Sequence, residues 1–405
     1  MSEFKGKQIV SVFDLNKCLE CHTCTVADKM LWTNRSGREY MYWNHVETMP
    51  GYGYPRGWGS GGKNQTASGT GQVLGGGFKD VVLEEGRTDG KVKSRGPVMR
   101  EGKDPDLETD YGIPWEYNYE EVFNPGKSHE TPGATGPRPH YKGKEVIPKW
   151  GPNWEEDQGA DEWPNHWAFA LPRICNHCTD PACLAACPRK AIYKRQQDGV
   201  VLIDQERCRG YRHCVRACPY KKIYFNYSTG KSEKCILCYP RIEKGVPPAC
   251  FWQCPGKMRF IGWKDDENSA VHKLIYKWKV ALPLHPEYGT EPNVFYVPPI
   301  GGSFKFGENG ELTEERRIPI EYLGRLFGGV KNVKSVQDTI LAEKEKMRKG
   351  IKSELCMILI GHDSEDRFQL NVNGKPFHRP EEVQPVKVQF VTPSQDKSKG
   401  HKSDV

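Results

Sequence analysis

Short segments in which apolar and polar residues alternate recur along the chain. Strands are expected at residues 9–13, 191–195, 200–203, 222–227 and 258–262. The dipeptide Asp198-Gly199 lies between two of these segments and favours a tight hairpin turn. Residues 228–230 close a second hairpin of the same kind. Because a cysteine-rich loop precedes each hairpin, the pattern predicts an internal repeat.

Three stretches lack this regularity. Residues 51–77 hold eleven glycines, a composition typical of an extended surface loop. Residues 115–167 carry five tryptophans among many prolines, which predicts a loop-rich cover that packs over the core or meets a partner protein. The prolines of residues 282–299 predict an extended wrapping segment, because proline is disfavoured in helices and in central strands.

The C-terminal part returns to regular patterns. A helix is expected to begin at Ser335 and to end before Gly350. A small β unit is expected to follow, with strands at residues 355–360, 367–372 and 386–390. The polar tail is expected to be disordered.

Fourteen of the fifteen cysteines fall in four short runs. The runs are Cys18-Cys21-Cys24, Cys175-Cys178-Cys183-Cys187, Cys208-Cys214-Cys218 and Cys235-Cys238-Cys250-Cys254. Thiolates at this density, with proline after the last cysteine of three runs, are typical of iron–sulfur clusters. The remaining Cys356 stands in an apolar segment and is expected to be a buried structural thiol.

These patterns together predict an α+β fold for electron transfer. We expect two pseudo-symmetric bacterial-ferredoxin-like units with long loop-rich insertions and a small C-terminal β extension. The expected segments are the first part of the core (1–28), an insertion (29–169), the main core (170–263), a wrapping segment (264–334), a C-terminal helix and β unit (335–391) and a tail (392–405).

Other readings of the cysteines and of the charge are weaker. A disulfide scaffold is typical of small secreted domains, whereas this chain has 405 residues. A zinc-binding module remains an alternative, because Cys-x2-Cys pairs also form zinc sites. The net charge of +7 could indicate nucleic-acid binding, but many cations lie within the cysteine runs. There they offset the negative charge of clusters held by thiolates.

In two-cluster ferredoxins the last cysteine of one run ligates the cluster of the other run. Applied to four runs, this rule predicts two crossed pairs of clusters. The expected ligand sets are Cys18, Cys21, Cys24 and Cys254; Asp28, Cys235, Cys238 and Cys250; Cys175, Cys178, Cys183 and Cys218; and Cys187, Cys208 and Cys214.

Two positions depart from the four-cysteine pattern. Asp28 stands where a fourth cysteine is expected, and its carboxylate could ligate iron; otherwise it is an ordinary polar residue and its cluster lacks one iron. Tyr211 also stands in a cysteine slot, which predicts a three-iron cluster rather than a phenolate ligand. His22, His177 and His213 lie in the loops as possible donors to cluster sulfur or as ligands, and we interpret them as loop residues.

Several segments resemble the iron–sulfur β subunits of nitrate reductases and nitrite oxidoreductases, which belong to the type II dimethyl sulfoxide reductase family. The resemblance covers residues 8–300 and is carried by residues 18–24, 50–58, 208–222, 234–243 and 281–299. It implies three 4Fe-4S clusters and one 3Fe-4S cluster. It also implies electron relay between a molybdenum-bis-pterin catalytic α subunit and a haem-containing γ subunit, with a higher-order assembly left open.

Asp28 and the short chain make the sequence most similar to the anammox-type nitrite oxidoreductase β subunit. This similarity implies a complex that oxidises nitrite to nitrate, or runs the reverse reaction. Respiratory nitrate, selenate and chlorate reductases and ethylbenzene dehydrogenase stay open as alternatives. No nucleophile elbow, phosphate loop or carboxylate pair is evident, so the chain is expected to be a non-catalytic subunit.

The sequence also bears on membrane contact and on export. No apolar run approaches the roughly 18 residues that span a bilayer, so any membrane contact is expected to go through a partner. Residues 1–17 lack the pattern of a signal peptide. Within the resemblance, this implies export with the catalytic partner to a periplasm-like space or organelle lumen; the alternative is the cytoplasmic face of the membrane.

Overall fold

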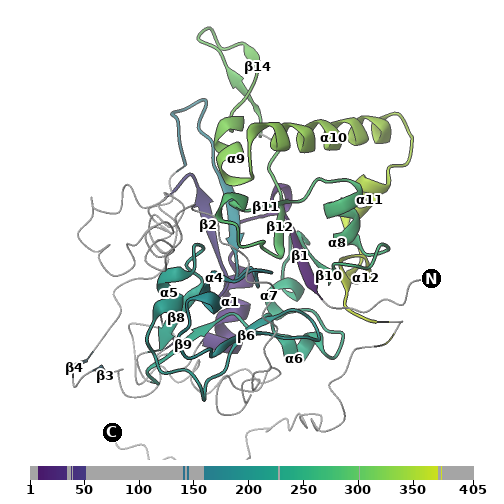
Figure 1. Ribbon diagram of the computed structural model, residues 1–405. Helices are drawn as coiled ribbons and strands as arrows, with labels where there is room; N and C mark the ends of the chain where they lie inside the picture. The colour runs from purple at the N-terminus through teal and green to yellow at the C-terminus, as the bar shows by residue number, and fades with distance from the viewer. Residues whose placement is uncertain are drawn as a thin grey trace, which may run out of the picture.

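A five-stranded sheet lies at the centre of the computed structural model (Figure 1). Its strands run in the order β11 (Leu282–Pro283), β12 (Val294–Val297), β1 (Ile9–Asp14), β10 (Arg259–Trp263) and β15 (Phe368–Gln369). The structure describes residues 8–33, 38, 40–51, 159–226, 229–300, 302–372 and 375, and the backbone of 140–141 and 144–145. Strand β1 pairs antiparallel with β10 and parallel with β12.

Strand β1 is buried on both faces. Ile9 and Phe13 belong to one hydrophobic cluster, whereas Val10 and Val12 belong to a second one. This division follows from the two-residue period of a strand, which turns successive side chains to opposite faces. The predicted strands at both edges of the cysteine-rich region are therefore confirmed.

Both predicted hairpins are present. Strand β6 (Ile192–Lys194) pairs with β7 (Val201–Ile203), and β8 (Ile223–Asn226) pairs with β9 (Lys231–Lys234). At the first turn, the Asp198 carboxylate accepts the Val200 N–H at 2.9 Å. A separate ladder joins β2 (His45–Met49) to β5 (Phe169–Arg173). It brings together the two ends of the long insertion.

Five short helices carry or flank the cysteine runs. They are α1 (Thr23–Asp28), α4 (Ala182–Ala185), α5 (His213–Ala217), α6 (Tyr239–Ile242) and α7 (Ala249–Trp252). Helix α1 packs against α7, and α4 packs against α5. Figure 1 shows all five in the lower half of the molecule. The mixed α+β content is confirmed, while the pseudo-symmetry of two units and the segment boundaries stay predictions.

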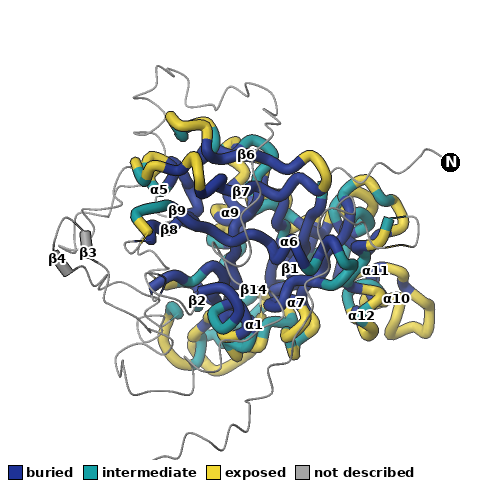
Figure 2. Tube along the Cα trace, turned by 90° about the horizontal axis from the view of Figure 1, so that it is seen from below, coloured by how far each residue is buried: buried dark blue, intermediate teal, exposed yellow. Residues whose placement is uncertain are grey.

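The remaining elements lie mainly after the core. They are β3 (His140–Tyr141), β4 (Lys144–Glu145), α8 (Ala270–His272), β13 (Phe304–Phe306), β14 (Leu312–Arg316), α9 (Ile320–Leu326), α10 (Val330–Arg348), α11 (Glu354–Ile360) and α12 (Ser364–Arg367). Figure 2 shows burial concentrated around β1 and the two hairpins, whereas α10 is largely exposed. None of the helices in the described part of the chain is long and apolar enough to cross a membrane.

The predicted C-terminal β unit is wrong over the described residues. Residues 355–360 form helix α11, because the Ser353 hydroxyl accepts the Cys356 N–H and Gly361 ends the helix with a φ of 52°. Helix α10 also begins before the predicted Ser335. In the predicted strand 367–372 only β15 forms, and it joins the main sheet. Residues 386–390 lie outside the described part.

Two predictions about the irregular stretches need correction. Strand β12 lies inside the sheet, although the segment around it was expected to exclude a central strand. Its four residues contain no proline, so their N–H groups are free to pair. Trp167 is buried, but Trp163 is 88% exposed and does not pack as the cover was expected to. The other three tryptophans of that stretch lie outside the described residues.

Candidate iron–sulfur sites

A cavity lies where two cysteine runs meet. Its lining includes Cys175, Cys178, Cys183 and Cys218, which is one of the four predicted ligand sets. The first three come from the loop after β5 and from α4, while Cys218 follows α5. Packing of α4 against α5 therefore brings thiols from two runs to one cavity. Four thiols around one space fit a 4Fe-4S cluster, which takes four cysteine ligands.

Asp28 lies among the cysteines of the second predicted set. It interacts electrostatically with Cys235, Cys238 and Cys250. Its carboxylate accepts the Asn44 N–H at 3.0 Å, and burial raises its pKa to about 6. In the described part of the chain this backbone contact is the only hydrogen bond of the buried carboxylate, which therefore retains lone pairs for a metal ion.

The sulfur atom of Cys238 is itself a hydrogen-bond acceptor. The indole Nε1 of Trp32 donates to Cys238 Sγ at 3.0 Å, and both residues are buried. Donors to sulfur stabilise negative charge there, as the ligands of iron–sulfur clusters require.

The first predicted set lies between α1 and the segment after α7. Cys18 interacts electrostatically with Cys24 and Cys254. Cys21 is exposed, and its sulfur lies 3.3 Å from Thr23 Oγ1. This set therefore reaches the protein surface.

The fourth predicted set also lies near the surface. Cys214 interacts electrostatically with Cys208 and Cys187. Tyr211 is 59% exposed, so its ring is largely in solvent. The turn before it requires glycine: Gly210 has a φ of 68°, and a Cβ there would lie 2.1 Å from the Gly230 carbonyl oxygen.

The four sets follow one another in space. Arg259 interacts with Cys18, Cys24 and Cys254 of the first set and with Cys250 of the second. Cys235 of the second set interacts with Cys175 of the third. Helices α4 and α5 each carry cysteines of both the third and the fourth sets at or just beyond their ends. The arrangement is therefore a row that reaches the surface at Cys21 and at Tyr211.

Burial keeps most of these thiols protonated in the absence of metal. It raises the pKa of Cys18 and Cys238 to about 11 and that of Cys214 to about 12. Metal ligands must be deprotonated, so cluster assembly would release protons. Among the described residues, no group of three or more His, Cys, Asp or Glu side chains is spaced to hold a single metal ion.

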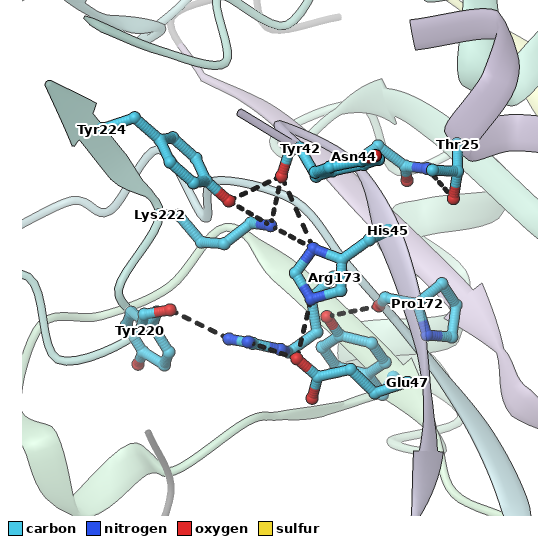
Figure 3. A network of polar contacts seen from close by, with 11 residues as sticks. Thr25, Tyr42, Asn44, His45, Glu47, Pro172, Arg173, Tyr220, Lys222 and Tyr224 are labelled. Carbon is cyan, nitrogen blue, oxygen red and sulfur yellow. Dashed lines mark hydrogen bonds and ion pairs between the residues drawn. The ribbon is translucent and has the colours of Figure 1, made fainter. Parts of the chain in front are cut away.

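A buried polar network extends from the β2–β5 ladder, and Figure 3 shows its side chains. The Glu47 carboxylate contacts Arg173 at 2.5 Å and His45 Nε2 at 2.7 Å. Burial and the charge of Lys222 lower the pKa of His45 to about 3, so the ring is neutral. Its Nδ1 then accepts a hydrogen bond from Lys222 Nζ at 2.8 Å, and its Nε2–H donates to Glu47.

Lys222 places this network between two of the sets. It lines the cavity of the third set and interacts electrostatically with Asp28 and Cys235 of the second. Burial lowers its pKa to about 7. Several other cations of the runs, such as Arg189 and Arg207, are exposed instead. Charge compensation by cations is therefore concentrated at a few buried side chains.

The three loop histidines differ. His213 is exposed and His22 is half-buried. His177 is buried and lines the cavity of the third set, where its Nδ1 accepts the Val201 N–H at 3.0 Å. Its Nε2 has no hydrogen-bond partner among the residues that the structure describes. Since Nδ1 is an acceptor in the neutral ring, Nε2 carries the proton.

Several residues around the sites were not predicted from the sequence. They are Trp32, His45, Glu47, Arg259 and Arg367. Arg367, carried by the C-terminal α12, interacts electrostatically with Cys254 and links that part of the chain to the first set. For Arg259 a signal existed, because a charged residue stands within a predicted apolar strand. Cys356 is buried in α11, as expected of a structural thiol.

Comparisons with known proteins show that the chain is similar to iron–sulfur proteins and to β subunits of oxidoreductases. The family model described as "4Fe-4S dicluster domain" matches residues 166–264. The chain is 52% identical over 365 residues to the dimethylsulfide dehydrogenase subunit beta of Rhodovulum sulfidophilum, covering 90% of this chain and 99% of the relative. It is 52% identical over 363 residues to the selenate reductase subunit beta of Thauera selenatis, covering 89% and 98%. It is 35% identical over 423 residues to the respiratory nitrate reductase 1 beta chain of Escherichia coli (strain K12), covering 84% and 80%.

Proposed function

Because the chain belongs to the iron–sulfur β subunits of molybdoenzymes of the dimethyl sulfoxide reductase family, we propose that it holds four clusters in a row and conducts electrons between two partner subunits. As a member of this family, the chain is an iron–sulfur electron-transfer β subunit. The cluster ligands, the number of clusters and the identity of the partners are proposed from its residues and their geometry.

The proposed ligands are the four predicted sets. Three 4Fe-4S clusters are held by Cys18, Cys21, Cys24 and Cys254; by Asp28, Cys235, Cys238 and Cys250; and by Cys175, Cys178, Cys183 and Cys218. One 3Fe-4S cluster is held by Cys187, Cys208 and Cys214. When bound, such clusters accept and release electrons at potentials that depend on cluster type, charge, hydrogen bonds and solvent exposure. The cavity lined by cysteines from two runs is the observation that supports this proposal best.

The protein's own residues set the conditions for transfer. Trp32 donates to a ligand sulfur, and Arg259 and Lys222 lie between neighbouring sets. Burial of most of the ligands excludes water from the inner sites. Cys21 and Tyr211 are exposed at the two ends of the row, where partner subunits could exchange electrons with it. We propose that these partners are a molybdenum-bis-pterin α subunit and a haem-containing γ subunit.

For the reaction of the complex, we propose nitrite oxidation to nitrate or its reverse. The family resemblance and Asp28 support it. A second candidate is the chemistry named for the relatives, because the identity to the selenate reductase and dimethylsulfide dehydrogenase subunits exceeds that to the Escherichia coli nitrate reductase chain. Placement of the complex outside the cytoplasm stays a prediction.

Activity assays on the complex and on the isolated chain test these proposals. The purified complex is tested with nitrite, nitrate, selenate, chlorate and dimethyl sulfide, each with a suitable redox dye. Turnover of nitrite or nitrate at the highest kcat/KM supports the proposal, and preference for another substrate supports the second candidate. The isolated chain is expected to turn over none of them, so activity without partners would refute its assignment as an electron relay.

A further inference from the structure

Arg259 is a buried cation without the partners that such a group normally has. It opens strand β10 and is 0% exposed. None of its Nε, Nη1 and Nη2 atoms has a hydrogen-bond partner among the described residues. Buried charges in proteins are normally paired and hydrogen-bonded, because removing them from water is costly. The missing partners therefore indicate that anionic acceptors belong beside the guanidinium.

Aromatic rings account for only part of its surroundings. The guanidinium carbon lies 4.6 Å from the centroid of the Phe13 ring and 5.5 Å from that of Phe251. The centroids of the two rings are 5.4 Å apart and their planes meet at 65°, so each ring supports the position of the other beside the guanidinium. Cation–π contacts stabilise the charge but accept no hydrogen bonds in the plane of the fork. The N–H groups remain available.

The acidic groups near Arg259 belong to two different ligand sets. The guanidinium interacts electrostatically with Cys24, Cys250, Cys254 and Cys18, and Cys250 directly precedes Phe251, one of the two rings that it contacts. Three of these cysteines are proposed ligands of the first cluster, and Cys250 is a proposed ligand of the second. A planar fork with five donors can serve acceptors on two sides at once.

We propose that Arg259 is a positioning residue shared by two clusters, whose N–H groups donate to sulfur atoms of the first and second clusters and raise both reduction potentials together. This inference rests on the proposed ligand sets. Donors and positive charge near a cluster stabilise its more negative, reduced form. Since one side chain serves both, its replacement changes two of the four potentials and leaves the other two in place.

The test is a redox titration of the complete complex followed by low-temperature EPR. Arg259→Gln removes the charge and most of the donors, while Arg259→Lys keeps the charge and loses the fork. We expect two midpoint potentials to fall together, further in Arg259→Gln than in Arg259→Lys. The matched control is Arg195→Lys, because Arg195 is also buried and lies 4.5 Å from the Tyr239 ring centroid but pairs with Glu243. No potential should shift in that variant.

A measurement on the unmutated protein tests the inference even if the variants fail to assemble. In a complex labelled with ¹⁵N-arginine, pulsed EPR should detect nitrogen coupling to the first and second clusters. Unchanged potentials in Arg259→Gln with all four signals intact, or the absence of arginine coupling, would overturn the inference. An unmutated complex that lacks the four cluster signals would instead refute the proposed function.

Discussion

Cys175 and Cys218 line the same cavity although they belong to different runs of the sequence. Packing of α4 against α5 brings them together, as the crossed ligand rule of two-cluster ferredoxins requires. The rest of the row extends from this cavity: toward Asp28 through Cys235 on one side, and toward Tyr211 through the paired helices on the other.

Replacement of Tyr211 by cysteine tests the fourth site. Tyr211→Cys supplies the missing thiolate, so we expect the three-iron EPR signal of the complex to be replaced by a four-iron signal. Tyr211→Phe is the matched control and should keep the three-iron signal, because the exposed phenol is not a ligand. Loss of that signal in Tyr211→Phe would indicate a phenolate ligand.

Asp28 should behave as a ligand of iron. In Asp28→Asn the neutral amide is a poor ligand, and we expect the second site to lose one iron and to give an additional three-iron signal in EPR. Asp28→Cys restores an anionic ligand and should keep four irons with a shifted potential. If Asp28→Asn leaves both the iron content and the spectrum unchanged, Asp28 is an ordinary buried acid.

His177 should influence the third site through its Nε2–H. His177→Asn places an amide oxygen where Nδ1 accepts the Val201 N–H but removes the donor that faces the cavity. A neutral hydrogen bond contributes about 1 kcal/mol, which corresponds to a fall of roughly 40 mV in the potential of a one-electron couple. The measurement is the EPR-monitored redox titration. His213→Asn, at an exposed loop position, should cause no shift; equal potentials in both variants would contradict this role.

The buried polar network of His45, Glu47, Arg173 and Lys222 should contribute to the stability of the protein. Glu47→Gln leaves the buried Arg173 without its carboxylate, a change that typically costs about 3–5 kcal/mol. We expect a clearly lower midpoint of thermal cluster loss, followed by visible absorbance. Glu315→Gln is the control, because that surface pair with Lys305 should contribute less than about 1 kcal/mol. Similar midpoints in the two variants would exclude a structural role for the network.

The ion pair of Glu47 and Arg173 also predicts how the stability of the protein changes in acid. Burial raises the pKa of Glu47, but Arg173 and His45 together hold it below its usual value. An acid with a lowered folded-state pKa contributes stability above its unfolded pKa and loses it as the pH falls through the folded one. The contribution of Glu47 should therefore persist at pH values where ordinary glutamates are already protonated. The measurement compares the free energy of unfolding of Glu47→Gln with that of the unmutated protein across this pH range.

The sequence revealed the parts of the structure that depend on local spacing. The hairpin at Asp198 and the strands at both edges of the core follow from short patterns. Helix α11 was mistaken for a strand, because its alternating apolar residues outweighed the cap at Ser353 and the glycine at its end. Those two cap residues were the better evidence for a helix.

Contacts between side chains that are far apart in the sequence could not be predicted in the same way. Arg259 stands beside sulfur atoms from both ends of the core, and no local pattern shows that its charge is buried between them. His45, Glu47 and Arg173 meet only because β2 and β5 pair across the long insertion. The sequence therefore predicts the ligands, whereas the three-dimensional packing identifies the buried charged residues that lie beside them.

Iron analysis combined with an EPR redox titration of the intact complex tests the row of clusters most directly. Three four-iron clusters and one three-iron cluster correspond to about fifteen iron atoms per chain. We expect that content, one three-iron signal and three four-iron centres with separate potentials. A colourless protein with stoichiometric zinc, or an iron content far below this value, would contradict the proposal of a conducting row.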